Sequence, residues 1–143
     1  MATGQYRKQN LLPSDLDVTT VLSSETLSTG SYADSTAEFD CRGFREVDFF
    51  IKVETINSMT AIQVQPEAGQ TISGNVLYAK YLAEDIDGGV STTDVYTIGL
   101  NDPAIQTTTP YKVTLPVEGR FIRLALKAVG GTGVVSVYAQ RRV

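Results

Sequence analysis

The side chains best suited to chemistry in this sequence are carboxylates that gather before a flexible turn. Glu84, Asp85 and Asp87 precede Gly88 and Gly89, and oxygen-rich loops of this kind bind calcium. Their spacing does not match the spread of ligands in an EF-hand loop, which also lies between two helices. An acidic turn in solvent explains the cluster better than a metal site does. We therefore predict no metal and no cofactor.

Pairs of carboxylates can also cleave glycosidic bonds, one acting as the acid and the other as a base or nucleophile. The candidates share a position on turns, where an acidic residue also serves solubility: Glu67, Glu84, Asp85, Asp87 and Asp102. No pair stands out among them. Grooves that bind sugars are commonly lined by Trp, and the chain has none. The pattern therefore predicts no catalytic residue.

The absence of His removes whole classes of mechanism. Ser-His-Asp and Cys-His nucleophile systems and histidine-bearing zinc sites all need an imidazole. The single cysteine, Cys41, lies between Asp40 and Arg42 without a second Cys or a His to activate it. Packing in the core is therefore the preferred interpretation over a reactive thiol. We expect a protein that is not an enzyme.

Size and charge place the chain among folded soluble domains. With 143 residues, 42% hydrophobic and 20% charged, it can build one core. The net charge of -4 argues against nucleic acid as a partner. No apolar run reaches bilayer-spanning length, and none follows the basic N-terminus as in a secretory leader. We expect neither membrane association nor secretion.

The charge is distributed unevenly along the chain. Residues 1–111 carry six basic and fifteen acidic side chains, whereas residues 112–143 carry six basic and one acidic. One interpretation is that solvated strand faces balance an acidic remainder. The other is a basic patch that meets an acidic partner or an acidic region of a neighbouring copy. On the second interpretation, Arg141 and Arg142 are candidate partner contacts.

Alternating apolar and polar residues predict about eight short strands. The clearest lie in residues 45–54, 60–66, 94–100, 111–117, 120–128 and 134–140, with weaker ones in 18–22 and 37–40. Residues 76–83 also suit a short helix, but Tyr78 and Tyr81 favour a strand. Residues 45–54 and 60–66 are expected to pair as one hairpin, and residues 120–128 and 134–140 as another. Residues 67–70, 23–31 and 101–110 are expected to be loops.

These elements predict an all-β fold, a single-domain antiparallel β-sandwich of jelly-roll-like topology. Residues 13–143 form the sandwich domain, and residues 1–12 form an extended N-terminal arm. Such an arm suits a segment that becomes ordered on a partner surface, and the alternative is a disordered terminus without function. The candidate partner contacts within it are Tyr6, Arg7, Lys8, Leu11 and Leu12.

Two stretches carry a resemblance to small structural proteins of tailed bacteriophages. Residues 39–51, FDCRGFREVDFFI, are similar to a corner in those proteins where a short strand enters a long one. Residues 119–127, the turn at 130–133 and residues 135–140 resemble their closing hairpin. The resemblance covers residues 36–143. It implies a β-sandwich that carries no catalytic residues.

The resemblance implies a non-enzymatic virion structural protein. Such a capsid decoration or cement protein binds the outside of a tailed-phage head and bridges subunits of the major capsid protein. The implied partners are the major capsid protein and the chain itself, as a homotrimer, on the exterior of the virion after synthesis in the host cytoplasm. A neck, tail or head-fibre component is the alternative. A carbohydrate-binding module, using Tyr in place of Trp, is a third interpretation.

Overall fold

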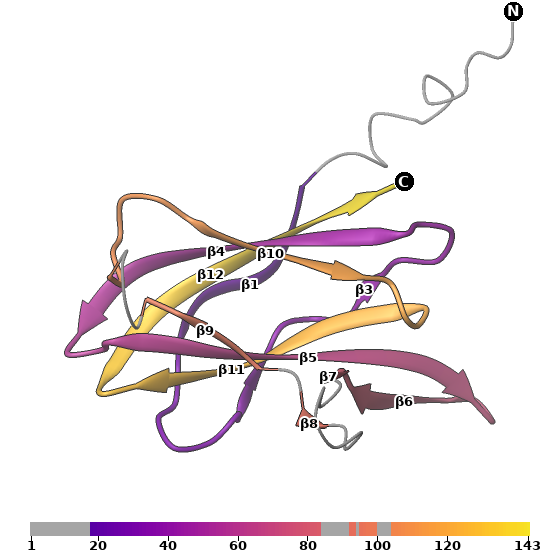
Figure 1. The fold of residues 1–143 in the computed structure, drawn as a ribbon, viewed down its shortest axis with the longest axis horizontal. Helices are drawn as coiled ribbons and strands as arrows, with labels where there is room; N and C mark the ends of the chain where they lie inside the picture. The colour runs from indigo at the N-terminus through magenta and orange to yellow at the C-terminus, as the bar shows by residue number, and fades with distance from the viewer. Residues whose placement is uncertain (1–17, 84–91, 94, 100–103) are drawn as a thin grey trace, which may run out of the picture.

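A computed structural model of the chain describes residues 18–83, 92–93, 95–99 and 104–143, which form strands joined by turns (Figure 1). These residues contain no helix long and apolar enough to cross a membrane. Their strands are β1 (Thr19–Thr26), β2 (Asp34–Ser35), β3 (Phe39–Asp40), β4 (Glu46–Asn57), β5 (Ala61–Ile72), β6 (Asn75–Lys80), β7 (Leu82–Ala83), β8 (Thr92–Thr93), β9 (Tyr96–Ile98), β10 (Tyr111–Pro116), β11 (Phe121–Val129) and β12 (Thr132–Arg142). The arm at residues 1–12 and the acidic turn at 84–89 lie outside the described residues.

The strands form two antiparallel sheets that face each other. One sheet has the order β1-β12-β4-β10, and the other has the order β2-β11-β5-β6, with β3 also beside β11 and β9 also beside β5. Strands β7 and β8 pair separately. This order is that of a jelly roll, because the chain passes repeatedly from one sheet to the other while β5 and β6 pair within one sheet. The predicted fold class is confirmed, and the strands beyond the predicted ones, β2 and β8, have two residues each.

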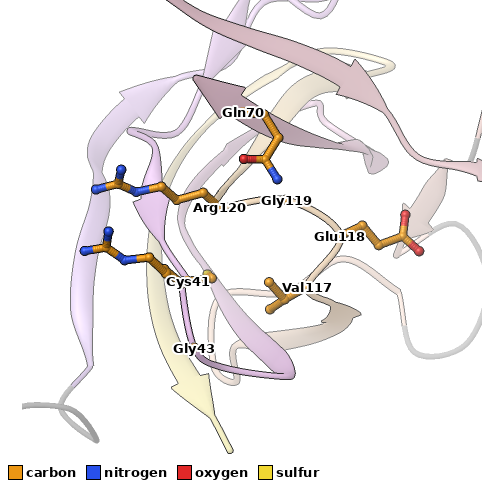
Figure 2. A pocket seen from close by; sticks show the side chains of 8 residues that line it. Cys41, Gly43, Gln70, Val117, Glu118, Gly119 and Arg120 are labelled. Atoms are coloured by element: carbon orange, nitrogen blue, oxygen red, sulfur yellow. The ribbon is translucent and has the colours of Figure 1, made fainter. Parts of the chain in front are cut away.

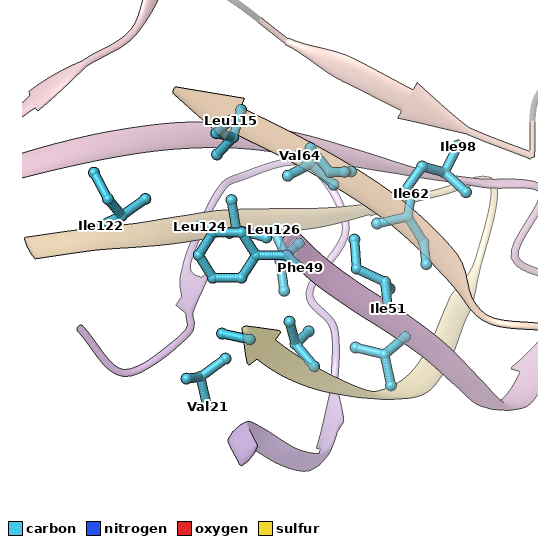
Figure 3. Close-up of a cluster of buried hydrophobic side chains, with 14 of the residues drawn as sticks. Val21, Phe49, Ile51, Ile62, Val64, Ile98, Leu115, Ile122, Leu124 and Leu126 are labelled. Carbon is cyan, nitrogen blue, oxygen red and sulfur yellow. The ribbon is translucent and has the colours of Figure 1, made fainter. Parts of the chain in front are cut away.

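The core lies between the two sheets, where alternation along each strand turns one face inward. On β4, Val47, Phe49 and Ile51 are fully buried, as the sequence pattern predicted. Figure 3 shows Phe49 beside Leu124 and Leu126, which come from the opposite sheet. The apolar residues of both sheets thus form one cluster.

Both predicted hairpins are wrong. Strands β4 and β5 lie in opposite sheets, and so do β11 and β12. The turns at Ser58 and Gly130 therefore cross from sheet to sheet. They lie against each other, since Thr60 N donates to the carbonyl of Val129 and Ser58 pairs with Thr132. A short turn between two alternating segments looks the same in sequence whether the strands pair or face each other.

The strand predicted to end at Pro66 continues to Ile72, and the loop expected at residues 67–70 is part of β5. Pro66 fits because its carbonyl faces away from β11, accepting from Tyr81 N at 3.1 Å. In a strand, the N–H and C=O of one residue point the same way. The missing N–H would therefore have faced the gap between β9 and β6, so no bond to β11 is lost.

Two smaller expectations have opposite outcomes. The loop expected at residues 23–31 is partly wrong, because β1 runs to Thr26 and Leu27 is fully buried. The strand assignment for residues 76–83 is confirmed by β6 and β7.

Candidate functional site

Arginines from three parts of the chain meet at one end of the sandwich, which we call the arginine-rich end. Its members come from the β3–β4 turn, the β10–β11 turn and the end of β12: Arg42, Arg45, Arg120, Arg141 and Arg142. The jelly-roll topology brings these segments together, because both turns and the C-terminal end of β12 lie opposite the Ser58 and Gly130 crossings. We regard this end as the candidate interaction surface.

Backbone hydrogen bonds hold the three segments of this end in place. Cys41 N donates to the carbonyl of Arg120 at 2.7 Å, and Arg45 N donates to the carbonyl of Arg142 at 3.0 Å. Val117 N donates in turn to the carbonyl of Arg45 at 2.9 Å. The arginines therefore project from a fixed backbone, so their side chains are partly preorganised for contact.

Arg141 is used inside the fold. It pairs with Val47 on the core-facing side of its sheet, and its guanidinium carbon lies 5.2 Å from the ring centre of Phe39 and 5.0 Å from that of Phe44. Its Nη1 donates to the carbonyl of Asp40 at 3.1 Å. Its Nε is buried without a hydrogen-bond partner in the described part of the chain. Arg141 therefore closes the end of the core with cation–π contacts.

Arg142 is also engaged within the chain, on the opposite face of β12. It forms ion pairs with Glu46 at 2.8 Å and with Asp48 at 3.1 Å across the β4–β12 pairing. The Asp48 side chain is only 5% exposed and accepts a hydrogen bond from Thr114 at 2.6 Å. Arg142 therefore compensates a buried carboxylate, whose charge would otherwise be costly.

Arg42, Arg45 and Arg142 are all exposed at this end, but Arg142 is held by its ion pairs. Among the residues that the structure describes, neither the Arg42 nor the Arg45 guanidinium has an ion pair. Arg120, by contrast, lies 3.2 Å from Asp40. Burial favours the neutral form of Asp40, but hydrogen bonds from Arg42 N–H and Arg120 outweigh it and lower the pKa of that carboxyl. Asp40 therefore stays ionised, with Arg120 as its ion-pair partner and a weaker attraction to the Arg42 charge, and the Arg42 and Arg45 side chains keep donors for a partner.

A shallow pocket of about 470 Å³ opens between the two turns. Arg42, Gln70, Val117, Glu118 and Arg120 line it. Figure 2 shows the side chains of Arg120 and Glu118 extending in opposite directions from this pocket. A wide opening with one acidic and two basic side chains suits a protein surface better than an enclosed small ligand, which prefers a concave apolar cavity.

Cys41 lies beneath this pocket and is fully buried, in agreement with the packing role predicted for it. Burial raises the pKa of its thiol to about 12, against the lowering effect of the Arg141 charge. The thiol form is a poor nucleophile.

The raised pKa of Cys41 links stability to alkaline pH. The unfolded thiol ionises near pH 9 and the folded one near pH 12, so above pH 9 the unfolded state binds fewer protons and stability falls. Between pH 8 and pH 10 this linkage lowers the free energy of unfolding by about 1.4 kcal/mol. We expect urea unfolding to show this loss, and Cys41→Ala to reduce it. An equal loss in the variant would contradict the assignment.

The carboxylate and tyrosine candidates do not form an open site in the described residues. Within those residues, no group of three His, Cys, Asp or Glu side chains could hold a metal ion. Glu67 is engaged by Arg123 at 2.6 Å. The same guanidinium lies 3.6 Å from the centre of the Tyr78 ring, which packs over Gly69. Tyr81 is buried.

The predicted partner contacts have separate outcomes. Arg141 and Arg142 lie at the arginine-rich end but have partners within the fold. The others, Tyr6, Arg7, Lys8, Leu11 and Leu12, lie outside the described residues. Sequence reasoning missed Arg42 and Arg45. The alternation along β12 does indicate that Arg141 faces inward. The buried Val135, Val137 and Ala139 are also odd-numbered, and alternate residues of a strand lie on the same face.

The fold and this end define a class of protein, an all-β jelly-roll domain with a preorganised basic surface. No known protein family matches the sequence, and no curated protein matches it.

Proposed function

We propose that this protein is a non-enzymatic decoration protein of a tailed-phage head, binding the outside of the shell and bridging major capsid subunits. The observation that carries the proposal is the arginine-rich end, where Arg42 and Arg45 are exposed on a hydrogen-bonded backbone. The resemblance of residues 36–143 to phage structural proteins supports the same class.

The chemistry of this end specifies the partner surface. A guanidinium presents a planar fork of donors that matches a carboxylate in two parallel hydrogen bonds. The contact on the capsid is therefore acidic. One such contact is weak, but contacts to adjacent capsid subunits add through effective concentration. Arg7 and Lys8 of residues 1–12 carry charge that suits the same acidic partner.

A neck, tail or head-fibre protein would use the same surface at a different copy number. The test is therefore the number of copies of this chain per major capsid protein in purified particles, measured by quantitative mass spectrometry. Decoration requires a ratio near one copy per capsid subunit. A ratio of a few per cent would place the chain at the neck, tail or a fibre, and absence from particles would overturn the virion assignment.

The role of the arginine-rich end has its own test. We expect the double change Arg42→Glu, Arg45→Glu to lower binding to particles that lack this protein at least tenfold, because both fork donors are replaced by repelling charges. The measurement is cosedimentation with particles at two salt concentrations.

The matched control is Lys52→Glu, Lys112→Glu, which changes charge equally at two exposed lysines on the outer face of the β4 sheet. It should bind almost as the unchanged protein does. Equal loss in both double variants would mean that net charge, and not the arginine-rich end, governs binding.

A further inference from the structure

The β5–β6 hairpin extends beyond the part of the sandwich where both sheets overlap. Strand β5 pairs with β11 only as far as Gly69, and its last residues pair with β6 alone. In Figure 1 the turn of this hairpin projects past the β10–β11 turn. The core-facing side of the hairpin is therefore not covered by the other sheet near the β5–β6 turn.

The uncovered inward face carries two large apolar side chains beside the polar Gln70 and Asn75. Ala68 lies opposite both the buried Ile122 and Ala79, so alternate residues along β5 and β6 continue the core-facing side. Two of them are Ile72, which is 52% exposed, and Leu77, which is 56% exposed. They line a hollow of about 480 Å³ with Ala68 and Ala79. Large apolar side chains on a core-facing side are usually covered.

The same hairpin has an open backbone edge. Strand β6 pairs with β5 on one side, and no described strand pairs with its other side. Tyr81 N donates to Pro66, so odd-numbered residues here direct their backbone groups to β5. Val76 and Tyr78 consequently direct theirs to the open edge.

The other edge strands of the described sheets carry more protection than β6 does. Strand β1 has register shifts around Leu22, β10 contains Lys112 and Pro116, and β2, β3 and β9 have two or three residues. Bulges, lysines, prolines and short length are the usual means of preventing edge pairing. Residues 68–79 contain no charge and no proline, and the one lysine of β6, Lys80, is its last residue. This edge is therefore competent to accept another strand.

We infer that β6 pairs antiparallel with β6 of a second copy of this chain, across a two-fold axis at Leu77. This register sets Leu77 against Leu77, Val76 against Tyr78 and Asn75 against Ala79. Val76 and Tyr78 are the residues whose backbone groups face the edge, so they form the hydrogen-bonded pairs. Lys80 falls opposite the uncharged Gly74. A contact of this kind is self-complementary and meets no like charge.

The contact joins the two uncovered inward faces. With the axis perpendicular to the sheet, Ile72 and Leu77 of both copies lie on one side, where the leucines cover each other. A two-fold contact closes on two copies and so differs from the trimer implied by the resemblance. No arginine of the arginine-rich end takes part in this contact, but the hollow adjoins the pocket of that end, since Gln70 and Glu118 line both.

Disulfide trapping in the full chain tests the register. In a pair without hydrogen bonds the Cα atoms are about 4.5 Å apart, which a disulfide can span. We expect Leu77→Cys to form a covalent dimer under mild oxidation at micromolar protein. The native Cys41 is buried and adds no background. Val18→Cys is the control, because Val18 is 51% exposed elsewhere. No dimer, or equal trapping in the control, would overturn the pairing.

Light scattering after gel filtration tests the association without cysteines. The unchanged protein should elute as a dimer, and Leu77→Lys should elute as a monomer with an unchanged circular dichroism spectrum, since the residue is exposed. Val18→Lys should remain dimeric. A monomeric unchanged protein, or a dimer or trimer that persists in Leu77→Lys, would overturn the inference.

Discussion

Replacing Phe49 with Ala should lower the free energy of unfolding by about 3–5 kcal/mol, the range for a fully buried aromatic side chain. Phe49 has no exposed surface and lies against Leu124 and Leu126 of the facing sheet (Figure 3). Its removal takes away apolar burial and leaves a cavity that two hydrogen-bonded sheets cannot fill by moving together. Urea unfolding at neutral pH measures the change.

The neighbouring Phe50 provides a matched control. It is the same residue type on the same strand, but it faces outward between Tyr138 and Lys112 and is only partly buried. Phe50→Ala should cost about 1 kcal/mol. A register slip of one residue would exchange the two faces of a strand. Equal losses in the free energy of unfolding for the two variants would therefore contradict the assignment of Phe49 to the core side of β4 and Phe50 to its outer side.

Replacing Gly131 with Ala should destabilise the fold by about 2–3 kcal/mol or more. A Cβ at Gly131 would lie 2.5 Å from the carbonyl oxygen of Asn57 and 2.6 Å from the carbonyl carbon of Ser58. Both are backbone atoms of the neighbouring crossing, so neither moves cheaply. We expect the loss to appear in urea midpoints and as a lower yield of soluble protein.

Gly43→Ala separates crowding from backbone conformation. Gly43 has a φ of +88° with nothing within 4 Å of an added Cβ, so its cost is the left-handed conformation alone, about 1 kcal/mol. Gly131 has no such φ. If Gly131→Ala unfolded no more easily than Gly43→Ala, the close packing of the two crossings would be wrong.

The arginines show how far sequence reasoning reached at the candidate site. The excess of basic residues in 112–143 drew attention to the C-terminal end of β12. It did not separate Arg141 and Arg142, which have partners in the fold, from the exposed Arg42 and Arg45. Whether an arginine can bind a partner depends on whether carboxylates or aromatic rings of the same chain already contact it. Asp40, Glu46 and Phe39 make such contacts here, and all three are distant from residue 141 in sequence.

The sequence by itself determined the all-β class, the position of most strands and the buried face of β4, because alternation is local and apolar burial follows from it. It also excluded imidazole chemistry and an internal disulfide. Only the tertiary structure decided that β4 and β5, like β11 and β12, face each other across the core. It alone showed that Pro66 lies within a strand and that β6 leaves an open edge beside the exposed Ile72 and Leu77. The reason is physical: a turn, a proline or an exposed leucine acquires its role from the strands beside it, and those pairings join residues far apart in the chain.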